Sequence, residues 1–126
     1  MAFSYIKSLF QHSFHAEIDD LVERFLTIPI ITPDGIYEGS HGVPSGSTFT
    51  NEVDSLVQYI VALSTGAIKN SKMFQIQGDD GIYLIDKEDL NGFIDSFKSF
   101  GLSLNVSKSH FSSEYCVYLQ RYYSLN

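Results

Sequence analysis

Two adjacent aspartates, Asp79 and Asp80, are the residues of this sequence best suited to chemistry. They lie between two apolar stretches, residues 73–77 and 82–85, and the short connection predicts a tight hairpin with both carboxylates at its tip. One or two carboxylates on a rigid turn suit Mg²⁺, which completes its octahedron with water and substrate phosphates. A pair of such ions serves phosphoryl transfer, because it stabilises the attacking and the leaving oxygen. Aspartate and glycine are also ordinary turn residues, so residues 78–81 alone fit either a metal site or a plain turn.

A second candidate region, residues 39–47, precedes the aspartates by one predicted helix and is too rich in Gly, Ser and Pro to be a regular element. Gly46 permits a close approach of the backbone to a substrate, and Ser45 and Thr50 bring hydroxyls that donate or accept hydrogen bonds. The spacing around Ser45 does not match the Gly-x-Ser-x-Gly turn of a serine hydrolase. A phosphate-binding P-loop is excluded because no Gly-Lys-Ser/Thr follows.

The spacing of apolar residues predicts the elements that must position these groups. Steps of three and four predict helices over residues 3–26, from about 48 to 63, and from 86 to 100, the last capped by Asp86 and ended by Gly101. Strands are expected at residues 28–32, 36–37, 73–77, 82–85, 102–106 and 115–119. Hairpins and helices mixed in this way predict an α+β fold, a small antiparallel sheet with helices packed on one face.

Composition limits the classes of function. The chain has 126 residues and a formal charge of −7, from 8 basic and 15 acidic residues, which argues against a protein that binds nucleic acid by its own charge. The lone Cys116 cannot form an internal disulfide, and His12 with His15 lacks two further zinc ligands. No apolar run approaches the 18–20 or so residues that span a bilayer, so we expect no membrane partner.

Two stretches together resemble a known family. Gly42-Val43-Pro44-Ser45-Gly46-Ser47-Thr48-Phe49-Thr50 and then Gln77-Gly78-Asp79-Asp80 resemble motifs B and C of viral RNA-dependent RNA polymerases, most closely the partitivirus-like polymerases of double-stranded RNA viruses. Reverse transcriptases also carry paired aspartates on such a hairpin, but they lack this Ser-Gly loop. The resemblance implies a partial palm domain over residues 1–126. Its motifs B, C and D would lie at about 40–54, 74–85 and 90–108, with a possible motif E at about 117–122.

The resemblance implies roles for individual residues. Asp79 would be the principal ligand of Mg²⁺ or Mn²⁺, and Asp80 a supporting one. Ser45 and Gly46 would form the loop that admits the nucleotide, and Thr50 would lie near the ribose 2′-hydroxyl that separates RNA from DNA precursors. The implied activity is template-directed transfer of nucleotides from NTPs to an RNA 3′ end. The implied partners are template and nascent RNA, NTPs and the rest of the polymerase, in the host cytoplasm or inside the virion.

Two positions depart from the family or carry an alternative. The family usually has an Asn where this chain has Asp54, which we keep as a candidate ribose-sensing residue. Lys108 follows the third predicted helix and strand, where family members carry a lysine thought to protonate the leaving pyrophosphate. A lysine there works as a general acid if neighbouring charges tune it. The alternative for Lys108 is a solvated loop lysine.

Parts of the family pattern are not found in the sequence. Motif A would supply Asp-x-x-x-x-Asp before the first helix, and residues 1–40 contain no such spacing. Fingers and thumb are also not found, and a metal-binding palm without its cationic RNA-binding flanks is expected to be acidic. We therefore expect a fragment that is inactive in isolation. The alternative from another class is a truncated or host-integrated viral remnant that acts at most as an interaction module.

Overall fold

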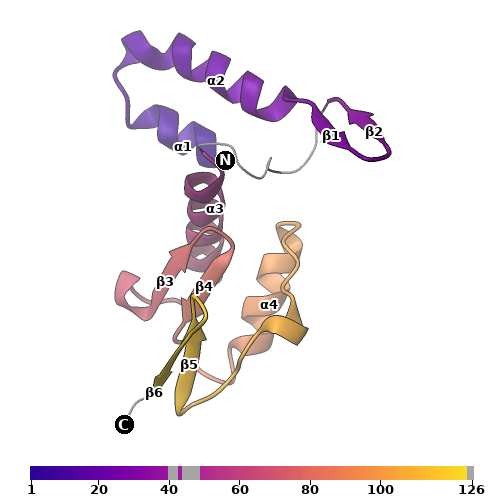
Figure 1. The fold of residues 1–126 in the computed structure, drawn as a ribbon. Coiled ribbons are helices and arrows are strands. Elements are labelled where there is room, and N and C mark those ends of the chain that lie inside the picture. Colours follow the sequence, from indigo (N-terminus) through magenta and orange to yellow (C-terminus); the bar gives the residue numbers. More distant parts are fainter. Residues whose placement is uncertain (40–42, 44–48, 125–126) are drawn as a thin grey trace. The chain divides into compact units, whose positions relative to one another are not determined.

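The computed structural model describes residues 1–39, 43 and 49–124 (Figure 1). It divides into two compact units, Met1–Asp54 and Ser55–Asn126, which are described separately. The first unit contains α1 (Ala2–Ser8), the 3-10 turn η1 (His12–Phe14), α2 (His15–Thr27), β1 (Ile30–Thr32), β2 (Gly35–Tyr37) and the start of α3 (Thr50–Ser64). The second contains the rest of α3, η2 (Ser71–Met73), β3 (Phe74–Gln77), β4 (Asp80–Tyr83), α4 (Leu90–Ser99), η3 (Val106–Lys108), β5 (Tyr115–Tyr118) and β6 (Arg121–Ser124).

The predicted α+β fold is confirmed. All strand pairs in the described part of the chain are antiparallel, and by hydrogen bonding they form three two-stranded sheets, β1-β2, β3-β4 and β5-β6. In the second unit β4 also lies next to β5. The expected helix from about residue 48 is observed as α3, and residue 48 itself lies outside the described residues.

The prediction of one helix over residues 3–26 is wrong. The chain breaks after α1, where Gln11 takes an extended conformation (φ −61°, ψ 145°), and resumes as α2. A continuous helix would hold Phe3 and Phe25 about 33 Å apart at 1.5 Å per residue. The break lets their ring centroids meet at 5.0 Å, edge to face, with Phe25 buried. Helical periodicity describes neighbours three and four residues apart, so it did not reveal this contact between residues 22 positions apart.

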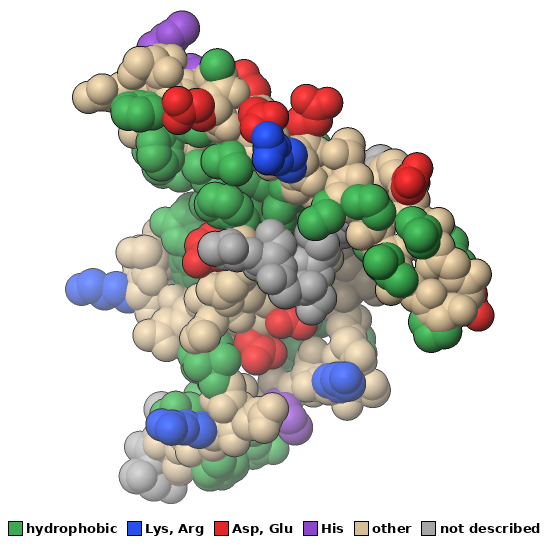
Figure 2. All heavy atoms as spheres, turned by 45° about the horizontal axis from the view of Figure 1, so that its top comes forward, with side chains coloured by type: hydrophobic (Ala, Val, Ile, Leu, Met, Phe, Trp, Pro, Cys, Tyr) green, Lys and Arg blue, Asp and Glu red, His purple; other side chains and the backbone are tan. Residues whose placement is uncertain are grey.

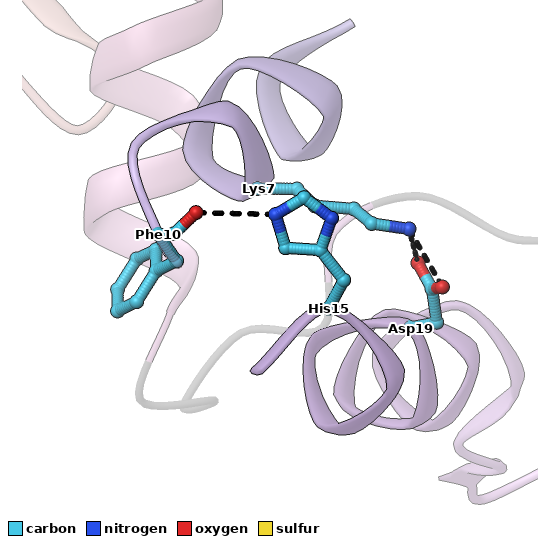
Figure 3. A network of polar contacts seen from close by, with 4 residues as sticks. All are labelled: Lys7, Phe10, His15 and Asp19. Atoms are coloured by element: carbon cyan, nitrogen blue, oxygen red, sulfur yellow. Dashed lines mark hydrogen bonds and ion pairs between the residues drawn. The ribbon is translucent and has the colours of Figure 1, made fainter. Parts of the chain in front are cut away.

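A polar network joins α1 to α2 (Figure 3). Lys7 Nζ lies 2.6 Å from Asp19 Oδ1 and donates to both carboxylate oxygens. His15 Nε2 lies 3.1 Å from the carbonyl oxygen of Phe10, in the connection between the helices. Asp19 is therefore paired with a basic residue of the other helix, and this partly exposed ion pair contributes little to stability.

Much apolar surface of the first unit stays exposed. Figure 2 shows hydrophobic side chains over the surface of α1 and α2 and over the β1–β2 hairpin. The hairpin predicted from residues 28–37 is formed, as β1 and β2. Its apolar side chains are nevertheless open to solvent, with Ile31 79% exposed and Ile36 65% exposed. Few hydrophobic side chains of the unit's described residues are buried, and such open surface is typical of a segment that packs against further protein.

The second unit has a core in which α3, the β3–β4 hairpin and α4 meet. Its buried members are Val61, Ala62, Ala67, Ile68, Phe74, Phe93 and Phe97. The half-buried ring of Tyr83 lies at the centre of the aromatic residues, with its centroid 5.0 Å from Phe93 and 6.1 Å from Phe97. Phe74 stacks on it from β3, with the centroids 6.2 Å apart. Tyr83 therefore links the hairpin to α4 through its ring.

The end of α4 agrees with prediction and its start does not. Gly101 has φ +79°, its N–H donates to the carbonyl of Lys98, and the N–H of Leu102 donates to that of Phe97. This pattern is a Schellman motif, which favours glycine at the left-handed position. The expected cap Asp86 lies four residues before the helix, in a turn, and its carboxylate lies 3.6 Å from Lys69 Nζ.

The strand predicted at residues 102–106 is not formed. The Leu102 N–H is already used by the helix end, and the side chains of Ser107 and Ser109 donate to Asn105, which favours the turn η3 over an extended ladder. The strand at 115–119 is confirmed as β5, and β6 was missed. The two strands are joined by Leu119 and Gln120, which both have positive φ (49° and 60°).

The β5–β6 turn predicts a stabilising substitution. Two successive positive φ angles match a type I′ turn, which favours Asn-Gly over Leu-Gln. Replacing both residues (Leu119→Asn with Gln120→Gly) should raise the free energy of unfolding by about 1–2 kcal/mol, because the left-handed conformation is costly for ordinary side chains. Urea unfolding followed by circular dichroism measures the change, and a less stable double variant would contradict this account of the turn.

The half-buried phenol of Tyr83 predicts a pH dependence of stability. Burial, helped by the neighbouring Tyr118, raises the pKa of the Tyr83 hydroxyl well above its usual value. Above about pH 10 the unfolded chain loses this proton while the folded chain keeps it. The free energy of unfolding then decreases as the pH rises, and the contribution is fully present below that range. Urea unfolding between about pH 8 and pH 11 should show a shallower decline in Tyr83→Phe than in the wild type; identical slopes would contradict the shift.

Candidate metal-binding turn

The paired aspartates lie at the β3–β4 turn, but only one of them is in the connection. Gln77 pairs with Asp80, so the connecting residues are Gly78 and Asp79, and Asp80 is the first residue of β4. The predicted four-residue connection is thus corrected to two residues. Gly78 has φ +62° and Asp79 does not have a positive φ. A positive φ at the first central position alone is the pattern of a type II′ turn, which favours glycine there.

Side chains of α3 bind both backbone polar groups of Gly78. The Gly78 N–H donates to Ser55 Oγ at 2.7 Å, and its carbonyl accepts from Gln58 Nε2 at 2.9 Å. Gly78 is buried, and a buried backbone group without a partner costs about 1–3 kcal/mol. These two bonds fix the position of the turn against the helix. We call Ser55 and Gln58, together with Tyr83, which hydrogen-bonds to Gln58, the turn clamp.

Tyr83 completes the turn clamp by holding Gln58. Its hydroxyl lies 2.8 Å from Gln58 Oε1 and donates to it. A tyrosine hydroxyl is protonated at neutral pH, and burial raises the pKa of Tyr83 further, so the hydroxyl remains a donor. The Gly78 carbonyl can only accept, so the amide of Gln58 has one orientation that satisfies both neighbours.

Gly81 makes room for this arrangement. A Cβ atom at Gly81 would lie 2.5 Å from the Tyr83 hydroxyl oxygen and 2.6 Å from Cε2, well inside van der Waals contact. The ring therefore lies over the strand where a side chain of residue 81 would be. The second glycine of the Gly-Asp-Asp-Gly sequence thus has a packing role.

The two carboxylates are available to a cation. Asp79 and Asp80 are both exposed, and neither forms an ion pair with any residue that the structure describes. No group of three or more His, Cys, Asp or Glu able to hold a metal occurs among those residues. Two exposed carboxylates on a fixed turn fit Mg²⁺, which uses one or two protein carboxylates beside water and phosphate oxygens.

The other predicted site residues lie on different elements. Thr50 begins α3 and Asp54 lies one turn later on the same face of the helix, both half-buried. Lys108 ends η3, is exposed, and forms no ion pair within the described ranges. Ser45 and Gly46 lie outside the described residues. The structure therefore describes the surroundings of Asp79 and Asp80, and the roles of all the predicted site residues stay predictions.

Sequence reasoning missed the turn clamp. Ser55, Gln58 and Tyr83 carry polar groups on elements read as apolar, and their contacts span 20–25 residues. Ser55 and Gln58 are polar residues within a helix of mostly apolar residues, which indicates that they bind a polar group of the protein. The sequence does not indicate that this group is the backbone of Gly78.

Comparisons with known proteins agree on one family. The family model described as viral RNA-dependent RNA polymerase matches residues 1–126. The RNA-directed RNA polymerase of Cryptosporidium parvum virus 1 (strain KSU-1) is 26% identical over 126 aligned positions, and the alignment covers 90% of this chain and 24% of that protein. A potential RNA-dependent RNA polymerase of a human picobirnavirus is 31% identical over 116 aligned positions, and the alignment covers 85% of this chain and 22% of that protein.

Solved structures give the same result. The RNA-dependent RNA polymerase of a human picobirnavirus, as an insertion-loop deletion mutant, superposes with a TM-score of 0.78 at 26% identity, over 98% of this chain and 26% of that one. A second structure of that polymerase gives a TM-score of 0.74 at 29% identity, over 98% and 25%. The chain thus spans about a quarter of the relatives that it matches. On the match of its whole length, the chain belongs to the viral RNA-dependent RNA polymerase family.

Proposed function

We propose that this chain is the part of a viral polymerase palm that binds the catalytic divalent cations during RNA synthesis. The observation that carries the proposal is the exposed Asp79, with Asp80 beside it, on a turn that α3 fixes through Gly78. The fragment character agrees with the share of its relatives that the chain spans. The proposed motifs B, C, D and E lie at about residues 40–54, 74–85, 90–108 and 117–122.

Asp79 is the proposed principal ligand of Mg²⁺ or Mn²⁺, with Asp80 in support. When bound, two such ions supply charge stabilisation to the attacking and leaving oxygens of nucleotidyl transfer. The chain's own contribution is a backbone that needs little reorganisation next to Asp79, because the N–H and the carbonyl of the preceding Gly78 are both hydrogen-bonded.

The remaining proposed residues act on the nucleotide. Thr50 and Asp54 project from successive turns of α3 and are proposed to contact the ribose, whose 2′-hydroxyl distinguishes RNA precursors. Ser45 and Gly46 are proposed to admit the nucleotide, and Lys108 to protonate the leaving pyrophosphate. The proposed partners are template and nascent RNA, NTPs and the rest of the polymerase, in the host cytoplasm or virion. None of the described helices is long and apolar enough to cross a membrane.

The carboxylate of Asp79 is tested by Asp79→Asn in a full-length polymerase that carries this segment. Removing its negative charge while keeping its shape should lower primer extension by roughly 10³-fold, the loss that follows from several kcal/mol of charge stabilisation. Binding of primed RNA in a filter assay should stay within about twofold, because phosphate contacts of basic residues dominate RNA affinity. Glu114→Gln, an exposed loop residue outside the proposed site, is the matched control. Undiminished synthesis by Asp79→Asn would identify Asp79 as a turn residue and favour the non-catalytic remnant.

The 126-residue chain by itself should not polymerise RNA. The proposed two-metal site needs a third carboxylate, which no described cluster supplies. Incubation with primed template, NTPs and Mg²⁺ or Mn²⁺ should give no extended product on a sequencing gel, with a complete viral polymerase as positive control. Templated product from the chain alone would show that its own residues complete the site.

A further inference from the structure

We propose that Gln58, held in place by the Tyr83 hydroxyl, is a positioning residue that selects the turn conformation in which Asp79 meets its divalent cation. The inference rests on the proposed function, which names Asp79 as a metal ligand. It adds two residues that do not themselves touch a cation or substrate. Their effect passes through a single backbone carbonyl, that of Gly78.

The Gly78 φ angle permits two turn types. Types I′ and II′ share a positive φ at the first central residue, and they differ by about 150° in its ψ and about 170° in the φ of the next residue. The change between them is a flip of the peptide that joins Gly78 to Asp79. Aspartate tolerates the left-handed conformation that type I′ requires, so the sequence of the turn does not exclude it.

Gln58 distinguishes these two conformations. Its Nε2 donates to the Gly78 carbonyl, which belongs to the peptide that flips, while Ser55 Oγ accepts from the Gly78 N–H on the other side. Flipping the peptide would turn the carbonyl away from Gln58 and leave a half-buried amide donor without its partner. The hydrogen bond therefore favours the type II′ form and the direction of Asp79 that goes with it.

Tyr83 sets the orientation of the Gln58 amide. Its ring is held among Phe74, Phe93 and Phe97, and its hydroxyl donates to Gln58 Oε1 at 2.8 Å. A reversed amide would place an oxygen against the Gly78 carbonyl, which is repulsive. The absence of a side chain at Gly81 is what lets the hydroxyl reach Gln58.

The test uses a full-length polymerase that carries this segment, with Gln58→Met and Tyr83→Phe as variants. Gln58→Met keeps the length of the side chain and removes its hydrogen bonds, and Tyr83→Phe removes one oxygen. Gln11→Met and Tyr37→Phe change the same residue types at exposed positions outside the proposed motifs and serve as matched controls. The readouts are the Mg²⁺ concentration at half-maximal extension, Mn²⁺ binding by electron paramagnetic resonance, and the thermal midpoint.

We expect Gln58→Met to raise the Mg²⁺ concentration at half-maximal rate about tenfold and to weaken Mn²⁺ binding similarly, the usual effect of losing a group that orients a metal ligand. Tyr83→Phe should give a smaller shift in the same direction, and both controls should stay within twofold. A merely structural role would lower the thermal midpoint and the amount of active enzyme without moving the half-saturating Mg²⁺ concentration. Wild-type metal dependence in Gln58→Met would overturn the proposal, and if that variant does not fold, Tyr83→Phe decides on the same criterion.

A direct measurement of the turn distinguishes this inference from the proposed function. In type II′ the amide protons of Gly78 and Asp79 are far apart, whereas the flipped peptide brings them together. The amide–amide NOE between them should therefore be weak in the wild type and strong in Gln58→Met. If Asp79→Asn is inactive while Gln58→Met behaves as the control Gln11→Met does, only the positioning role fails. If Asp79→Asn retains synthesis, the proposed function fails and the inference fails with it.

Discussion

The arrangement of this segment depends on how one buried glycine satisfies its backbone hydrogen bonds. Gly78 sits at the end of a hairpin, where its N–H and carbonyl have no partner in the β3–β4 ladder. Ser55 and Gln58 supply both partners from α3, so the hairpin cannot slide along the helix without exposing a donor or an acceptor inside the protein. Residue 79 follows directly on this glycine. The backbone position of Asp79 is therefore set by the hydrogen bonds from α3 to Gly78. The two short strands by themselves would make only a marginally stable hairpin.

The same hairpin is tied to the core through Tyr83, and the two attachments depend on each other. The ring packs with Phe93 and Phe97 of α4, while the hydroxyl reaches Gln58 on α3. Such a residue is costly to bury unless its oxygen finds a partner, and Gln58 is the partner. Packing of the Tyr83 ring in the core thus restrains its hydroxyl next to Gln58, and the hydrogen bond to Gln58 offsets the desolvation cost of that hydroxyl.

What the sequence could reveal depended on the range of the interaction. Elements set by local signals were predicted correctly: the hairpin around Pro33, the long helix α3, and the glycine that ends α4. The break before α2 depends on Phe3 meeting Phe25, and the missing strand at residues 102–106 depends on side chains of Ser107 and Ser109 that bind Asn105. The turn itself was predicted, but its clamp joins residues 20–25 positions apart, and no spacing rule pairs them. For the site, residue types and order indicated the chemistry, and only the fold indicated what holds Asp79.

The charges of Asp79 and Asp80 are not neutralised by a basic side chain of the described residues. Four other acidic residues, Asp19, Asp20, Asp86 and Asp95, pair with a lysine or arginine at 2.6–3.6 Å, whereas several further acids, such as Glu88 and Glu114, form no ion pair in the described ranges. The two turn aspartates form no such pair in that part of the chain, although adjacent carboxylates repel each other and gain most from a nearby cation. An exposed ion pair contributes little to stability, so leaving these two unpaired costs the fold little. It leaves their oxygens open to a cation that arrives with phosphates, whereas a lysine in that place would have to be displaced first. The turn thus combines a backbone that is held by hydrogen bonds at Gly78 with two carboxylates that form no ion pair among the described residues and can accept a cation.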